Sequence, residues 1–323
     1  MKAKNLLALT ALCAALGAAA QQQAQDFDVR DTWHECSTEM ATAQLLDFGD
    51  EDQPIRYAPD VVYAASHGQG LTLQIVRRIR QSEPMPCVIF IQGSAWMKQD
   101  TYSNLPMLSH FAERGYVVAM LQYTHSALAP FPAALQDVKS AIRFMRKNAD
   151  EWGVDPDNIF LWGDSSGGHL TLMTALAGDV AEYDSDLYTE YSTEINAFVA
   201  YYPVTNLLTM HEDPCASTDG SSTSFEGMFL GNRNVDDIPD EALAASPVSY
   251  VDASKPTKPI MIAVGTCDHI VPFSQSEMMA KKLDEAGKDY QYYVVPGADH
   301  GSWQFWTPQM FDIVDSFFDQ YKK

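Results

Sequence analysis

The sequence predicts an α/β fold with a mostly parallel central sheet, helices on both faces and a lid-like insertion. Apolar strand-like runs alternate with helix-like segments over most of the chain, which is the pattern of parallel βαβ units. The run at residues 88–91 contains no polar residue, as expected of a strand buried on both faces of such a sheet. Another apolar run ends in Gly163-Asp164-Ser165-Ser166-Gly167 and passes directly into a helix-like segment.

The expected elements follow one another in regular order. Two antiparallel edge strands joined by a glycine-containing turn come first, and helix 133–148 is expected from its apolar residues at helical spacing. The strands are predicted at 61–63, 71–76, 88–91, 116–123, the run from 159 to the Gly-x-Ser-x-Gly turn, 195–202, 259–264 and 290–295. The helices are predicted at 105–114, 133–148, 170–177, 274–286 and 307–321.

Residues 204–251 interrupt this alternation. Their central part is rich in Asp, Ser, Thr and Gly, with a small apolar patch that includes Phe225 and Phe229. Irregular insertions of this length in a compact domain usually serve a function or are disordered. We therefore predict a lid or specificity insertion at 204–251 within a catalytic domain at 59–323.

The N-terminus has the three parts of a secretory signal peptide. Lys2 and Lys4 precede an apolar stretch at residues 6–20, which ends in three alanines before a Gln-rich segment. Cleavage is expected after Ala20, which predicts a secreted or periplasmic protein with residues 21–58 as an N-terminal arm. A membrane anchor is the alternative, although the stretch is shorter than the roughly 20 residues needed to span a bilayer. Cys13 raises the option of a lipoprotein, but Leu12 stands where a small residue is needed.

The chain is strongly acidic. Its formal net charge is −22, and removal of Lys2 and Lys4 with the signal peptide lowers the charge to −24. Nucleic acids and anionic membrane surfaces would repel such a protein, so neither is an expected partner. No other apolar run is long enough to cross a membrane, and stable membrane insertion is not expected.

The cysteines leave their pairing open. Removal of the signal peptide leaves four of them, which permit three disulfide pairings that the sequence does not distinguish: Cys36, Cys87, Cys215 and Cys267. Cys87 opens an apolar run and is expected to be a buried free thiol. The Cys and His positions show no metal-ligand spacing, so we predict no metal and no cofactor. The oligomeric state is not predicted.

Ser165 is the predicted nucleophile. A strand, a sharp Gly-x-Ser-x-Gly turn and a helix are the context of a nucleophile elbow, in which glycines leave room for the backbone to fold back. The serine is then exposed in strained geometry at a helix N-terminus. A Gly/Ser-rich turn without chemistry is the alternative, because the five-residue pattern alone is common.

Asp268 and His300 are the predicted partners of Ser165. A serine hydroxyl needs an adjacent base and a third group that orients the base, and the order Ser, acid, His is expected along this type of chain. Asp268 follows the strand at 259–264 and His300 follows the strand at 290–295, so both should reach the edge of the sheet that holds the elbow. Alone, Asp268 would be read as a helix cap and His300 as a turn residue.

These motifs resemble the acetyl esterase/lipase branch of the α/β-hydrolases, which is related to hormone-sensitive lipase. The resemblance covers residues from about 61 to the C-terminus and is nearest to the bacterial feruloyl-esterase-like domains. It rests on Pro130-Phe131-Pro132-Ala133-Ala134-Leu135-Gln136-Asp137, Gly163-Asp164-Ser165-Ser166-Gly167-Gly168-His169, Gly265-Thr266-Cys267-Asp268 and Asp299-His300-Gly301. It implies the α/β-hydrolase fold.

An oxyanion hole is expected opposite the elbow. The residue after the nucleophile, Ser166, supplies one backbone N–H, and the loop at 92–96 is the natural source of others. The family usually has His-Gly-Gly, a small residue and Trp in this loop, and the resemblance implies donors at Ser94 and Ala95. Here Gln92 and Ser94 replace the His and the second Gly, so the bracing of the loop must differ.

The predicted activity is hydrolysis of carboxylic esters through an acyl-enzyme. Trp96, Trp303, Phe305 and Trp306 lie near the catalytic positions and are candidates for a substrate platform, with packing of the helix after His300 by some of them as the alternative. The expected substrate is a small ester or a plant polysaccharide that carries acetyl or feruloyl groups. Two other classes stay open. A peptidase of the prolyl-oligopeptidase type would need repeats for a propeller, which this chain lacks, and a binding module would normally lack a triad member.

Overall fold

The computed structural model describes residues 39–44, 46 and 54–323. The predicted signal peptide, Cys36 and most of the predicted arm lie outside these residues. The chain divides into two units, 1–49 and 50–323. In the first unit, the described residues include a turn in which the N–H of Ala43 donates to the carbonyl of Met40. All that follows concerns the second unit.

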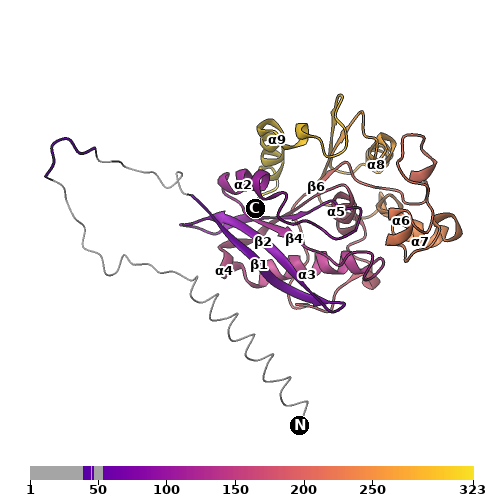
Figure 1. Cartoon of the computed structure of the whole chain (residues 1–323), viewed down its shortest axis with the longest axis horizontal. Helices are drawn as coiled ribbons and strands as arrows, with labels where there is room; N and C mark the ends of the chain where they lie inside the picture. The colour runs from indigo at the N-terminus through magenta and orange to yellow at the C-terminus, as the bar shows by residue number, and fades with distance from the viewer. Residues whose placement is uncertain (1–38, 45, 47–53) are drawn as a thin grey trace, which may run out of the picture. The chain divides into compact units, whose positions relative to one another are not determined.

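The second unit is built on an eight-stranded sheet with the order β1-β2-β4-β3-β5-β6-β7-β8 (Figure 1). The strands are β1 (Ile55–Ser66), β2 (Gln69–Arg78), β3 (Met85–Ile91), β4 (Val117–Leu121), β5 (Val154–Asp164), β6 (Phe198–Tyr201), β7 (Ile260–Gly265) and β8 (Tyr290–Val295). The pairs β1–β2 and β2–β4 are antiparallel, and the other five pairs are parallel. The predicted mostly parallel sheet is therefore confirmed.

Helices cover both faces of this sheet, and successive residues of a strand face opposite layers. In β3, Ile89 belongs to the core formed with α3 and α5, whereas Phe90 belongs to the core formed with α2 and α9. Figure 1 shows α2 and α9 on one side of the strands and α3 on the other. The α-helices described are α2 (Leu105–Glu113), α3 (Ala133–Lys147), α4 (Ala149–Trp152), α5 (Ser166–Leu176), α6 (Phe225–Phe229), α7 (Pro239–Ala244), α8 (Phe273–Glu285) and α9 (Pro308–Asp319). The described 3-10 turns are η3 (Ala181–Tyr183), η4 (Met210–Glu212), η5 (Val235–Asp237), η6 (Pro247–Tyr250) and η7 (Trp303–Trp306).

The predicted boundary between arm and domain is wrong by four residues. β1 begins at Ile55, which pairs with Arg78 of β2, so residues 55–58 belong to the sheet and not to the arm. The prediction missed them because this part of β1 is only partly buried and lacks an apolar run. The strand β2 is also not an edge strand, since it lies between β1 and β4.

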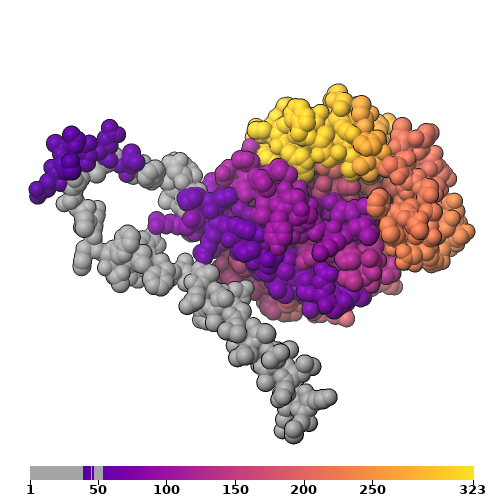
Figure 2. Space-filling view, in the orientation of Figure 1, coloured from indigo at the N-terminus to yellow at the C-terminus, as the bar shows by residue number. Residues whose placement is uncertain are grey.

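The predicted insertion at 204–251 connects β6 to β7 and contains only short helices. Its apolar residues are anchored in the main core, because Val204, Leu207 and Phe229 are almost fully buried there. In Figure 2 its orange atoms gather on one side of the second unit. Among the described residues, no helix has the length and apolar character needed to cross a bilayer.

Candidate active site

Ser165 stands at the turn between β5 and α5. Its backbone has φ 53° and ψ −123°, a conformation that L-residues rarely adopt. A Cβ on Gly163 would lie 2.3 Å from the carbonyl oxygen of Gly167, and a Cβ on Gly167 would lie 1.9 Å from that of Ile91. The two glycines therefore allow the helix to begin directly against β3, and the turn presents Ser165 at the carboxyl edge of the sheet.

His300 connects Ser165 to Asp268. Its Nε2 lies 2.9 Å from the Ser165 Oγ, and its Nδ1 lies 2.8 Å from the Asp268 Oδ2. The Asp268 side chain is fully buried, and its Oδ1 accepts the backbone N–H groups of Ile270 and Val271. One carboxylate oxygen thus fixes the loop after β7 while the other orients the imidazole. The three predicted catalytic residues meet in the geometry that nucleophilic catalysis requires.

The neighbouring His269 faces a different carboxylate. Its Nδ1 lies 2.5 Å from the Asp299 Oδ1, and Asp299 also accepts the backbone N–H of His300. These contacts hold the loop after β8 against the loop after β7. Asp299 therefore supports the backbone that carries His300, whereas Asp268 contacts the ring itself.

The structure corrects one predicted oxyanion donor. The backbone N–H of Ser94 already donates to the Ser166 Oγ at 2.9 Å, so this group stabilises the loop at 92–96. Ala95 and Ser166 both line the pocket that holds Ser165, and they stay the predicted donors. Ala95 has a positive φ of 53°, which the sequence does not reveal.

The loop at 92–96 is braced by contacts with the elbow, within the loop region and with Tyr123. The Gly93 N–H donates to the Asp164 Oδ1 at 2.7 Å, and the Ser94 Oγ donates to the Met97 carbonyl and lies 2.9 Å from the Tyr123 hydroxyl. Burial raises the pKa of Asp164. A Cβ on Gly93 would lie 2.7 Å from the carbonyl oxygen of Asp164, so the glycine allows this close approach.

Trp96 forms part of the pocket wall and is itself fixed. It is 2% exposed, stacks on Phe229 with ring centroids 4.5 Å apart, and lines the pocket beside Ser165. Its indole N–H donates to the His169 Nδ1 at 3.1 Å, and the His169 Nε2 lies 2.7 Å from the Ala245 carbonyl. An indole nitrogen only donates and a carbonyl only accepts, so His169 is neutral with its proton on Nε2.

Trp303 lies in a different environment. It is 73% exposed on η7 and does not line the pocket around Ser165. Its contact with substrate stays a prediction. Of the other aromatic residues after His300, Phe305 is fully buried and Trp306 stacks on Trp162, so both pack the core as the alternative interpretation expected.

Acid should weaken the fold through His169. Burial lowers the pKa of His169 from 6.5 to about 4, so the unfolded chain binds the proton first as the pH falls. The contribution of the neutral His169 ring to the free energy of unfolding is complete above pH 6.5. It falls by about 3 kcal/mol as the pH falls towards 4. We expect the difference in free energy of unfolding between the wild-type protein and His169→Gln, measured with urea, to be about 3 kcal/mol smaller at pH 4 than at pH 7. The same change at exposed His110 is the control, and an unchanged gap for His169→Gln would contradict the assignment.

The pocket beside Ser165 is small and is closed largely by the insertion. Its volume is about 30 Å³, room for one or two water-sized groups. It is lined by Ala95, Trp96, Ser165, Ser166, Val204, Met210, Ser217, Thr218, Phe225, Glu226, Ile270 and Val271. The segment predicted to set specificity thus supplies Glu226, a site residue that sequence reasoning missed because nothing in the insertion is periodic.

The described cysteines are unpaired. Among the described residues, Cys87, Cys215 and Cys267 are free, and Cys87 is buried as predicted. Burial raises the pKa of the Cys87 thiol to about 12. No group of three or more His, Cys, Asp or Glu residues within 39–44, 46 and 54–323 is placed to hold a metal ion.

Known proteins with similar sequences include esterases. The family model BD-FAE matches residues 73–283. Esterase LipQ of Mycobacterium tuberculosis (strain ATCC 25618 / H37Rv) is 31% identical over 288 residues, which are 84% of this chain and 66% of LipQ. The chain also spans only 56% and 55% of two further relatives from that organism, so it is shorter than each of them.

Similar solved structures include a carbohydrate esterase and a bifunctional GH43-CE protein, besides esterase 2 of Thermogutta terrifontis. A truncated carbohydrate esterase from gut microbiota has a TM-score of 0.74 and 25% identity, over 85% of this chain and 98% of its own. A bifunctional GH43-CE protein of Bacteroides eggerthii has a TM-score of 0.73 and 25% identity, over 83% of this chain and 38% of its own. Together with the sheet topology, these matches confirm the α/β-hydrolase fold and the predicted resemblance to its esterase branch.

Proposed function

The chain belongs to the BD-FAE family of α/β-hydrolases, and on that basis we propose that it hydrolyses carboxylic esters through an acyl-enzyme on Ser165. One observation carries the proposal: His300 lies within hydrogen-bonding distance of both the Ser165 Oγ and the Asp268 Oδ2. A base that contacts the nucleophile and is oriented by a buried carboxylate is the arrangement that activates serine.

The reaction proceeds in two halves. The Ser165 Oγ attacks the ester carbonyl while its proton passes to the His300 Nε2, and the oxyanion accepts the N–H groups of Ala95 and Ser166. The C–O bond to the alcohol then breaks, and the alcohol leaves with the proton from His300. Water next gives a proton to His300 and attacks the acyl carbonyl carbon. The bond between that carbon and the Ser165 Oγ then breaks, the acid leaves, and His300 returns the proton to the Ser165 Oγ.

The acyl group is proposed to be small, and acetyl fits best. The enclosed space beside Ser165 is about 30 Å³, which suits a methyl group and not a feruloyl ring. The alcohol portion is proposed to be a carbohydrate, since similar structures include a carbohydrate esterase and a protein that combines GH43 with an esterase. Acetylated plant polysaccharide is therefore the preferred substrate, with small acetyl esters as simpler ones.

A substrate panel tests this proposal. We expect acetate release from acetylated xylan and hydrolysis of p-nitrophenyl acetate, with kcat/KM falling by at least about tenfold from acetate to octanoate because the pocket excludes longer chains. Methyl ferulate should be hydrolysed more slowly than methyl acetate. A preference for octanoate or ferulate would contradict the proposed acyl group, and absence of any ester hydrolysis would contradict the proposed activity.

We also propose that the protein is exported and loses residues 1–20. The support is the basic, apolar and small-residue order at the N-terminus. The intact mass of the protein recovered from the periplasm or medium of a bacterial host should correspond to residues 21–323. Retention of the full-length chain in the cytoplasm would overturn this part of the proposal.

A further inference from the structure

Glu226 has a buried carboxyl oxygen with no partner in the protein. The residue is 0% exposed and lies in α6. Its Oε1 accepts the Thr218 hydroxyl at 2.5 Å, whereas its Oε2 contacts no donor among the described residues. A polar group that is removed from water without a hydrogen-bond partner destabilises the folded protein. Such a group inside an enzyme pocket can pair with a hydrogen-bond donor on a bound ligand.

The position of Glu226 connects this oxygen to the reaction. Glu226 lines the same small pocket as Ser165 and Ala95. Thr218, which holds the other oxygen of Glu226, lines that pocket and also a wider, open hollow of about 520 Å³. Thr218 therefore lies where the small pocket meets the open hollow, and it holds the carboxyl group of Glu226 beside this junction.

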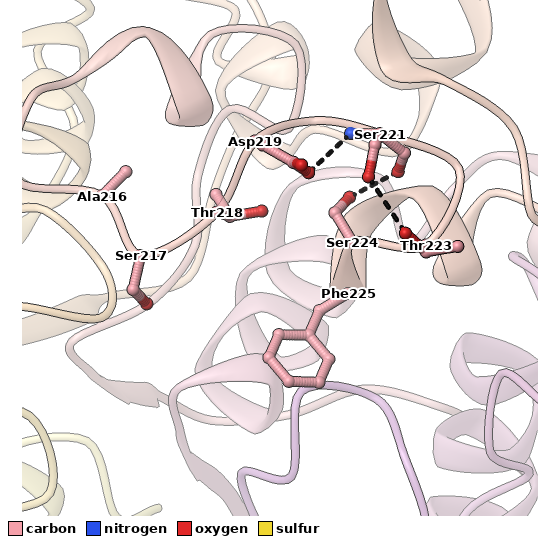
Figure 3. A pocket seen from close by; sticks show the side chains of 8 residues that line it. All are labelled: Ala216, Ser217, Thr218, Asp219, Ser221, Thr223, Ser224 and Phe225. Atoms are coloured by element: carbon pink, nitrogen blue, oxygen red, sulfur yellow. Dashed lines mark hydrogen bonds between the residues drawn. The ribbon is translucent and has the colours of Figure 1, made fainter.

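The open hollow has the polar lining expected for a hydroxyl-rich molecule. It is lined by Ala216, Ser217, Thr218, Asp219, Ser221, Thr223, Ser224 and Phe225, which Figure 3 shows along one loop and the start of α6. Ser221 and Thr223 share a hydrogen bond, and the Ser221 N–H donates to Asp219, so the loop is held in shape by its own polar contacts. Phe225 is 46% exposed and offers an apolar surface for a ring.

The acyl group and the alcohol of an ester lie in different spaces, the small pocket beside Ser165 and the open hollow. The enclosed pocket has room for a two-carbon acyl group, so the alcohol must extend into the hollow. The alcohol carbon bonded to the ester oxygen then lies between the small pocket and the open hollow, beside Glu226. A hydroxyl on the neighbouring carbon can donate to the Oε2, which supplies the missing partner.

We propose that Glu226 selects esters of vicinal diols, such as partly acylated sugars, by accepting a hydrogen bond from the free hydroxyl beside the ester. This inference rests on the proposed esterase function and deepens it, because it names the group on the alcohol that the site recognises. A hydrogen bond that completes a buried, unsatisfied acceptor contributes enough to raise kcat/KM by about tenfold or more over an alcohol that lacks the hydroxyl.

The test compares two esters that differ in one hydroxyl: trans-2-hydroxycyclohexyl acetate and cyclohexyl acetate. The wild-type protein should prefer the hydroxylated ester by about tenfold or more in kcat/KM. Glu226→Leu, which replaces the carboxyl by an apolar group of similar size, should bring the ratio to about one. Glu226→Gln keeps the shape of the side chain and the hydrogen bond from Thr218, and it should lower the ratio of the two kcat/KM values by at least about threefold. If Glu226→Leu does not fold, this second variant tests the inference.

The matched control is Glu241→Leu in the same insertion. Glu241 is exposed and pairs with Arg233, so its loss should leave the ratio unchanged. Equal rates for the two esters with the wild-type protein, or an unchanged ratio in both Glu226 variants, would overturn the inference while leaving the esterase function intact. A preference for cyclohexyl glycolate over cyclohexyl acetate that depends on Glu226 would place the hydroxyl on the acyl side and also overturn it. If the wild-type protein hydrolyses none of these esters, the proposed function itself fails.

Discussion

Replacing Ser165 with alanine is expected to lower kcat/KM for p-nitrophenyl acetate by on the order of 10⁵-fold. The variant removes the atom that forms the acyl-enzyme, and His300 then has no nucleophile within reach except water. The fold should be retained, because alanine is smaller and the Ser165 hydroxyl contacts only the His300 ring in the described structure. Initial rates at matched protein concentration measure the loss of hydrolysis, and a thermal melt shows whether the fold is retained.

The matched control for this change is Ser254→Ala in the loop before β7. Ser254 is exposed and its hydroxyl donates to Asp252, so the rate of p-nitrophenyl acetate hydrolysis should stay within a few-fold of the wild-type value. A Ser165→Ala variant that retains more than a tenth of the wild-type rate would show that another group carries the reaction.

Asp268→Asn should have the second largest effect, a fall in kcat on the order of 10⁴-fold. The amide can present an N–H to the His300 Nδ1, which would leave the imidazole proton on Nε2 and make that nitrogen unable to accept the Ser165 proton. The change also weakens the two backbone contacts of the buried carboxylate. Substrate binding is expected to change much less than kcat. A fall in kcat with a nearly unchanged KM would show that the His300 ring has lost its orientation, whereas a large rise in KM would show that the pocket has been disrupted.

Asp299→Asn is the comparison that isolates this role. Asp299 is the adjacent carboxylate and contacts His269 and the backbone of His300, but it does not contact the His300 ring. Its replacement should reduce kcat by no more than about tenfold. If Asp299→Asn were the more damaging of the two changes, the assignment of Asp268 as the orienting acid would be wrong.

The sequence could identify the candidate catalytic residues because topology brings them together. Ser165, Asp268 and His300 each follow a predicted strand, and parallel strands end at the same edge of a sheet. The structure places the three side chains within hydrogen-bonding distance at that edge. The strands and the helices α2, α3, α5, α8 and α9 were also predictable, whereas the start of β1 at Ile55 and the short helices α4, α6 and α7 were not.

The details of the oxyanion loop depend on contacts that no local pattern records. Ser94 was predicted to donate its N–H to the oxyanion, but the side chain of Ser166 takes this N–H. Asp164 stands within the elbow motif, yet its role in holding Gly93 follows only from the two loops approaching each other. A motif gives residue types and order, while the partner of each N–H is set by tertiary packing.

The insertion was the least predictable part of the site. The sequence indicated where it lies, and its irregular composition suggested a role in specificity. It did not indicate that Glu226 would be buried against the catalytic pocket, because a charged residue in a Ser/Thr-rich segment is expected at the surface. Burial of Phe229 beside Trp96 brings α6 over the elbow and carries Glu226 with it.

The central claim is that Ser165 is an activated nucleophile. Its most direct test is the intact and peptide mass of the protein after reaction with a fluorophosphonate probe. We predict one probe per chain, located on the peptide that contains Ser165, with labelling prevented in Ser165→Ala and strongly slowed in Asp268→Asn. Absence of labelling, or one probe on a different residue, would contradict the claim.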